Sequence, residues 1–119
     1  MKRSTVWIDH HKAHILDFSA NGINHRNLAI PEAHGKPSHE QLRKFYHEVA
    51  QSLKDIDCML VAGPGLAKDE FKNHCEEHHP KLAKAIVDVK PMKDHPSHEE
   101  ILKFSHDYFS RYMNWAPLS

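Results

Sequence analysis

The stretch that decides the fold is VAGPGLAKDEF, residues 61–71, where an apolar strand runs through a glycine turn into a helix. Such a turn points the free backbone N–H groups of the first helical turn at whatever lies beside it. The apolar run begins earlier, at Cys58, and is uninterrupted to Ala62, which is typical of a central strand covered on both faces. The sequence therefore predicts a strand, turn and helix at the centre of an α/β sheet.

Elements predicted on either side complete the fold. Strands are expected over residues 6–9, 13–18 and 23–30, joined by a short hairpin loop and by the turn at Asn21-Gly22. Helices are expected over residues 38–53, over residues 67–77, and from the capping box at residues 97–100 to Tyr112, with a helical patch or turn at 82–85 and a fifth strand at 86–89. The order β-β-β-α-β-α-β-α predicts a ribonuclease-H-like α/β fold with a mixed sheet, in two or three layers, as one domain over residues 1–119.

Composition narrows the class of protein. Sixteen basic residues balance sixteen acidic ones, so the basic footprint of a dedicated nucleic-acid binder, with a pI above about 9, is missing. Residues 1–7 lack the apolar core of a secretory signal, and no apolar run approaches the roughly 18 residues that span a bilayer. Cys58 and Cys75 lie in a predicted strand and a predicted helix, and we expect both as reduced thiols. These features predict a cytoplasmic protein whose RNA contacts, if any, are local or histidine-assisted.

The string GPGLAKDEF, residues 63–71, resembles the turn after the fourth strand in the middle domain of the eukaryotic and archaeal peptide-chain release factors and of Pelota. The hairpin at residues 6–13 and the helix at residues 97–109 extend this similarity over nearly the whole chain. The chain looks most like the small stand-alone bacterial proteins called translational machinery proteins. The resemblance implies a ribonuclease-H-like fold and a role that faces RNA or the ribosome.

The chain departs from the release factors at their catalytic loop. Those factors hydrolyse peptidyl-tRNA through a Gly-Gly-Gln loop between the third strand and the following helix, where residues 31–39 of this chain read PEAHGKPSH. The codon-reading and GTPase-recruiting domains of those factors also have no counterpart here. The resemblance therefore implies a non-enzymatic protein that needs no cofactor. Its expected partner is the ribosome or structured RNA rather than a membrane, and a homo-oligomer is left open.

Five residues are the candidates for RNA or phosphate binding. Gly63 and Gly65 shape the turn, and Lys68 adds positive charge at the helix start. Lys12 and Lys36 would lie near this turn if the hairpin, the 31–37 loop and the glycine turn share one end of the sheet. Under the same condition, Arg3 and Arg26 are further basic residues that could face RNA. One Gly-Pro-Gly turn lacks the full P-loop pattern, so the alternative is a tight strand-to-helix connection.

A divalent-metal-dependent nuclease is a further alternative, because ribonuclease-H-like nucleases gather carboxylates around Mg²⁺. Asp9 and Glu48 could supply two of these carboxylates and Asp88 a third. The fourth strand, however, ends in Gly63 where an acidic ligand is wanted. The incomplete carboxylate set argues against this activity.

Thirteen histidines are the unusual feature of the composition, and imidazole suits Zn²⁺, Cu²⁺ and Ni²⁺. His74 and His78 have the i, i+4 spacing that places two ligands on one helical face, with Cys75 and His79 beside them. The sequence therefore offers a zinc site at His74, His78 and Cys75, against the alternative of a solvated histidine-rich surface. Under either interpretation, mild acid makes the chain positive and strengthens RNA binding unless the histidines are buried.

Two aromatic residues remain open in function. Trp7 is either a core residue or, if it points outward, a platform on which a base stacks. Trp115 in the tail, or an exposed strand edge, would suit a small adaptor that meets another protein.

Overall fold

The computed structural model describes residues 2–31 and 35–112, so Trp115 lies outside the described residues. The strands are β1 (Arg3–Ile8), β2 (Lys12–Ser19), β3 (Gly22–Ala29), β4 (Cys58–Gly63) and β5 (Ile86–Pro91). The helices are α1 (His39–Gln51), α2 (Ala67–His78), α3 (Pro80–Ala85) and α4 (His98–Tyr112). Each helix among the described residues is too short or too polar to cross a membrane.

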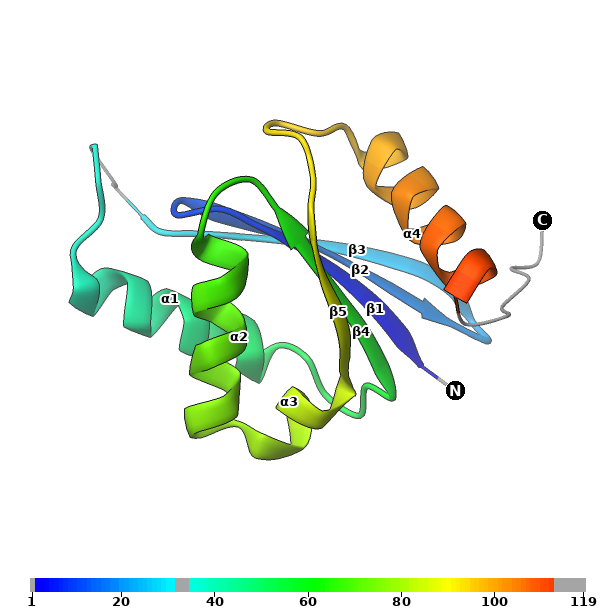
Figure 1. The fold of residues 1–119 in the computed structure, drawn as a ribbon, viewed down its shortest axis with the longest axis horizontal. Helices are drawn as coiled ribbons and strands as arrows, with labels where there is room; N and C mark the ends of the chain where they lie inside the picture. Colours follow the sequence, from blue (N-terminus) through cyan, green and yellow to red (C-terminus); the bar gives the residue numbers. More distant parts are fainter. Residues whose placement is uncertain (1, 32–34, 113–119) are drawn as a thin grey trace.

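The strands form one mixed sheet in the order β3-β2-β1-β4-β5 (Figure 1). The first three strands pair antiparallel, while β1 with β4 and β4 with β5 pair parallel. The predicted mixed α/β sheet is therefore confirmed. The segment predicted as a helical patch or turn is a separate short helix, α3, whose first residue is Pro80. Proline suits this position because its missing N–H is not needed in the first helical turn.

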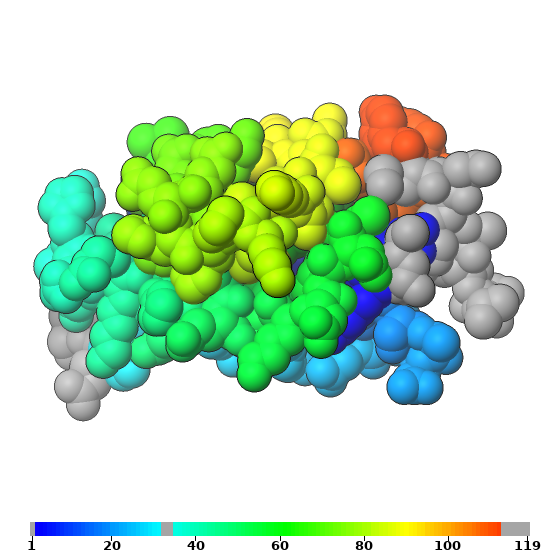
Figure 2. All heavy atoms as spheres, turned by 90° about the horizontal axis from the view of Figure 1, so that it is seen from below, coloured from blue at the N-terminus to red at the C-terminus, as the bar shows by residue number. Residues whose placement is uncertain are grey.

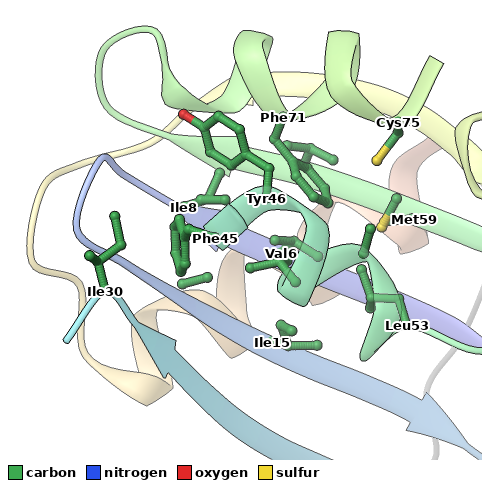
Figure 3. Packing of buried hydrophobic residues seen from close by; sticks show 14 residues of the cluster. Val6, Ile8, Ile15, Ile30, Phe45, Tyr46, Leu53, Met59, Phe71 and Cys75 are labelled. Atoms are coloured by element: carbon green, nitrogen blue, oxygen red, sulfur yellow. The ribbon is translucent and has the colours of Figure 1, made fainter. Parts of the chain in front are cut away.

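Helices cover both faces of the sheet, which makes three layers (Figure 1). On one face, alternate strand residues such as Val6, Ile15 and Val61 pack against α1 and α2 (Figure 3). On the other face, Leu60 and its neighbours pack against α4. The central strand β4 is thus buried from both sides, as its continuous apolar run predicts.

Trp7 belongs to the core on the α4 face. Its side chain is fully buried with Leu16 and Phe109, and its Nε1–H donates a hydrogen bond of 3.0 Å to the carbonyl oxygen of Lys93. A buried indole whose N–H is paired cannot offer a face to a nucleobase. The stacking role considered for Trp7 is therefore excluded.

Gly63 ends β4 at a point where the chain passes very close to β1. A Cβ at this position would lie 2.2 Å from the carbonyl oxygen of Ile8, and the φ of 154° is one that other residues rarely adopt. The contacting atom belongs to the backbone and cannot rotate away. Glycine is therefore required for the parallel contact of β4 with β1, and the tight-connection interpretation explains it without a ligand.

We expect Gly63→Ala to destabilise the protein by on the order of 3 kcal/mol, because the new methyl group meets fixed backbone. The matched control is Gly65→Ala: Gly65 has a φ of 59° and nothing within 4 Å of the added Cβ. That change should cost only about 1 kcal/mol of backbone strain. Urea unfolding of both variants measures the difference, and equal losses would contradict the role given to Gly63.

A pair of histidines joins α4 to the edge strand β3. His98 Nδ1 lies 2.9 Å from His25 Nδ1, and the ring of His14 lies 5.7 Å from that of His25. Burial, together with repulsion from His98 and His14, lowers the pKa of His25 below its ordinary 6.5. His25 is therefore neutral at neutral pH, and protonating it would place like charges side by side.

We predict that the free energy of unfolding falls as the pH drops below 6.5. As the pH falls through this range, the unfolded chain takes up a proton at His25 before the folded chain does. Wherever the unfolded state binds more protons than the folded state, lowering the pH lowers the free energy of unfolding. Well above pH 6.5, His25 is neutral in both states, so it should not make the free energy of unfolding depend on pH. Urea unfolding across pH 5 to 8 tests this, with His98→Gln expected to flatten the pH dependence and His106→Gln, an exposed histidine elsewhere on α4, expected to leave it unchanged.

Candidate functional site

A groove of about 630 Å³ lies between α1 and α2. The two helices lie side by side on the molecule's surface (Figure 2). The lining combines the β1–β2 hairpin through His10, the segment before α1 through Lys36, and the glycine turn through Leu66. The hairpin, the described part of the 31–37 loop and the glycine turn therefore do share one end of the sheet.

A hydrogen-bonded carboxylate lies in the groove. Glu70, in the first turn of α2, accepts a hydrogen bond of 2.7 Å from the Tyr46 hydroxyl and lies 3.0 Å from His10 Nε2. Burial and this bond raise the pKa of Tyr46 well above its usual range. The carboxylate also complements the positive end of the α2 dipole. Glu70 therefore ties the hairpin and both helices together at the place where an anion would otherwise bind.

The structure places the five RNA or phosphate candidates unequally. Lys36 lines the groove and is exposed, whereas Gly63 and Gly65 belong to the turn that leads to Leu66 and do not themselves line the groove. Lys68 folds back: its Nζ donates to the carbonyl oxygen of Gly65 and lies 3.6 Å from Asp69 Oδ2. Lys12 lies 5.9 Å from the centre of the Trp7 ring, on the α4 side. Only Lys36 among the three lysines is thus directed freely at the groove.

The guanidinium of Arg26 is used in hydrogen bonds within the fold and is not directed at a ligand. Its guanidinium donates a hydrogen bond of 2.8 Å to Asp17 Oδ2, and Ser4 donates 2.5 Å to the other oxygen of that buried carboxylate. A third bond runs from Arg26 to the carbonyl oxygen of Ser52. Removing the arginine would leave Asp17 as an uncompensated buried charge, which is strongly destabilising. Arg3 likewise has a partner and carries no functional proposal.

The structure does not bring the nuclease carboxylates together. Asp9 accepts hydrogen bonds from the backbone of His11 and Lys12 and so closes the hairpin loop. Asp88 accepts a hydrogen bond of 3.1 Å from Tyr108 on the α4 side, whereas Glu48 lies on α1. Within residues 2–31 and 35–112, no group of three metal-ligating side chains contains any of these acids. The described carboxylates therefore do not form the site that metal-dependent hydrolysis needs.

The predicted zinc ligands separate into two environments. The rings of His74 and His78 lie 4.8 Å apart on the α2 surface, as their spacing predicts. Cys75 instead points from α2 toward the sheet beside Met59, where it is fully buried (Figure 3). Burial raises the pKa of its thiol to about 12, so the thiolate that binds zinc is not available. Ala67, Phe71 and Cys75 recur every four residues, and this pattern could have shown that Cys75 faces the core.

Two histidines outside the predicted ligand set of His74, His78 and Cys75 lie beside His74. His47, on α1, places its Nδ1 3.2 Å from Nε2 of His79, the residue that follows α2. A ring nitrogen from each of His47, His74 and His79 lies within 4.8 Å of the others. His47 and His79 are far apart in sequence, so only the packing of α1 against α2 brings them together.

The two cysteines should react differently with a thiol reagent. Cys58 is half-buried at the start of β4, whereas Cys75 is fully buried. We expect iodoacetamide to modify Cys58 in the folded protein and Cys75 only after unfolding, because alkylation requires an accessible thiolate. Peptide mass spectrometry before and after urea treatment measures both rates, with Cys75→Ser as the control for assignment. Rapid modification of Cys75 in the folded protein would contradict its placement.

No family model matches the chain. In sequence it is similar to the Pelota homologue of Methanosphaera stadtmanae, with 32% identity over 91 residues, covering 69% of this chain and 26% of the relative. The Pelota homologue of Pyrococcus abyssi is 34% identical over 95 residues, which cover 74% of this chain and 26% of that protein. The chain thus spans about a quarter of the length of these curated relatives.

Solved structures show the same fold. Archaeoglobus fulgidus Pelota superposes with a TM-score of 0.64 at 19% identity, covering 95% of this chain and 38% of that one. S. cerevisiae Dom34 gives a TM-score of 0.60 at 12% identity, covering 94% and 34%. T. thermophilus RuvC gives 0.59 at 9% identity, covering 99% of both chains. The chain therefore contains a Pelota-like domain, and RuvC shares its fold, which is consistent with the predicted ribonuclease-H-like architecture.

Proposed function

We propose that this domain serves the translation machinery by contacting the ribosome or structured RNA, without catalysing peptide release. The observation that carries the proposal is the similarity to Pelota homologues in sequence as well as in fold. Dom34, which shares the fold, is a translation termination-like factor involved in RNA quality control pathways and interacts with Hbs1. Sequence identity above 30% supports common ancestry with Pelota more strongly than fold alone does.

The segment between β3 and α1 supports a non-catalytic role. Residues 30–38 read IPEAHGKPS and contain neither a pair of glycines nor a glutamine. Peptide release in the release factors depends on a Gly-Gly-Gln loop at this point. A domain that lacks these residues can occupy a related binding position without hydrolysing peptidyl-tRNA.

The end of the groove is the surface we assign to the RNA contact. Lys36 is exposed there, and His10 and His39 line the same groove. The Glu70 carboxylate lies at the start of α2, so the contact would rest on these cationic side chains rather than on the N–H groups of that helix. Phosphate contacts need cations and N–H donors and no base-specific geometry. Because the formal net charge is zero, such a contact should be weak and sensitive to salt.

The test is co-sedimentation of the untagged protein with ribosomes from a bacterial lysate at low and moderate salt. We expect pelleting that weakens as salt rises, because phosphate contacts release counterions. The double variant Lys36→Ala/Lys68→Ala should pellet several-fold less than the wild type. Lys81→Ala/Lys103→Ala removes the same charge from α3 and α4 and should pellet like the wild type.

Absence of pelleting at both salt concentrations would contradict a ribosome-bound role. Equal losses in the two double variants would indicate attraction by general charge rather than a contact at the groove end. Circular dichroism of each variant verifies that the fold is retained. Lys68 donates a hydrogen bond to its own turn, so removing it could also disturb the turn. The single variant Lys36→Ala removes a ligand contact without touching that turn.

A further inference from the structure

Three histidines from α1, α2 and the residue after α2 lie close together beside the groove, which His74 lines. His47 is exposed on α1, and His74 and His79 are half-buried at the end of α2. Their ring centres lie 5.1 Å apart for His47 and His79, 5.4 Å for His74 and His79, and 6.3 Å for His47 and His74. Three imidazoles so close together need a physical explanation, because each would repel the others if protonated.

A hydrogen bond explains part of this arrangement. His47 Nδ1 and His79 Nε2 are 3.2 Å apart, so one ring can donate to the other. His74 is left over: its Nε2 is buried and has no hydrogen-bond partner among the described residues. A buried polar atom without a partner costs roughly 1–3 kcal/mol. The cluster therefore contains a nitrogen for which the described residues provide no partner.

The surroundings of His74 and His79 favour the neutral form of both rings. Burial lowers the pKa of His74 to about 4, and repulsion from His78, His79 and His47 adds to the effect. Burial and the neighbouring histidines also lower the pKa of His79. Neutral imidazoles have lone pairs and are ready to coordinate.

The spacing of the nitrogens suits a late first-row transition metal. Zinc takes imidazole nitrogens at about 2.0–2.1 Å in a tetrahedron, so two of its ligand atoms lie about 3.3 Å apart. The 3.2 Å between His47 and His79 already matches this separation. The nitrogens offered by the three rings all lie within 4.8 Å of one another, so a bound ion would have to draw the rings closer to reach the tetrahedral separation.

We propose that His47, His74 and His79 form a three-imidazole site for a divalent transition metal, with Zn²⁺ as the expected ion and the fourth position open to water. This set replaces the predicted one of His74, His78 and Cys75, because Cys75 faces the core. Nitrogen ligands favour Zn²⁺, Cu²⁺ and Ni²⁺ over Mg²⁺ and Ca²⁺, which prefer oxygen. A bound ion would clamp α1 to the end of α2 and so hold both walls of the groove in place. The proposal does not depend on a role in translation.

The experiment is isothermal titration of Zn²⁺ into the untagged, metal-free full chain. We expect one ion per chain, and no heat of binding with Mg²⁺. His47→Ala and His79→Ala should each weaken binding by at least about tenfold, since even outer-sphere partners of metal ligands are worth 10–100-fold in affinity. His47 is exposed, so its removal should leave the fold intact, and circular dichroism verifies this.

Two control variants separate this site from its rivals. His78→Ala removes the other histidine of the predicted i, i+4 pair, and His106→Ala removes an exposed histidine on α4. Both should keep the wild-type affinity. Loss of binding in His78→Ala with retention in His47→Ala would assign the metal to the surface of α2 alone and overturn the proposal. Absence of zinc uptake by the wild-type chain would overturn it as well.

A bound ion should also stabilise the folded chain. Binding to the native state alone adds about 2.7 kcal/mol when the free ion is at 100 times its dissociation constant. We therefore expect Zn²⁺ to raise the melting temperature of the wild type and of His106→Ala but not of His47→Ala. Equal shifts in all three proteins would mean that zinc binds elsewhere, and would count against the three-histidine site.

Discussion

The parallel contact between β1 and β4 is the constraint on which the rest of the structure depends. It joins the antiparallel part of the sheet to the parallel strands β4 and β5. At its end, Gly63 lies so close to the backbone of Ile8 that no side chain fits between them. The chain leaves β1 for the hairpin at the same end of the sheet where β4 enters the glycine turn. This contact therefore gathers His10, Leu66 and Glu70 at one place, and the groove begins there.

The sheet also separates two groups of histidines. On one face, α1 and α2 bury a core and bring His47, His74 and His79 together at its edge. On the other, α4 packs over Trp7, and its first turn brings His98 to His25. In both places the histidines lie where a helix meets its neighbour, around an apolar core. Burial at these seams lowers the pKa of His25, His74 and His79, so mild acid charges the surface less than the count of thirteen histidines suggests.

Much of the fold is readable from the sequence because local rules specify it. The Asn21-Gly22 turn, the apolar run of β4 and the capping box of Ser97 with Glu100 all occur as predicted. Even the burial of Cys75 is implied by its spacing from Phe71. The sites are less readable because they depend on tertiary contacts. Nothing local shows that Arg26 pairs with the buried Asp17, that Lys68 folds back on its own turn, or that His47 meets His79.

Fold and sequence carry different weight in deciding what this domain does. Pelota, the translation termination-like factor Dom34 and RuvC, which was solved with a Holliday junction substrate, all have this architecture. The arrangement of the strands therefore does not distinguish between their functions. The side chains do discriminate. Asp9 closes a hairpin and Asp88 bonds to Tyr108, so the carboxylates that would hold Mg²⁺ are used in the fold. Where a nuclease needs an acid at the end of the fourth strand, this chain needs a glycine, because a side chain at Gly63 would collide with Ile8. The requirement for close strand packing thus excludes a ligand at that position and leaves the sequence similarity to Pelota as the stronger guide.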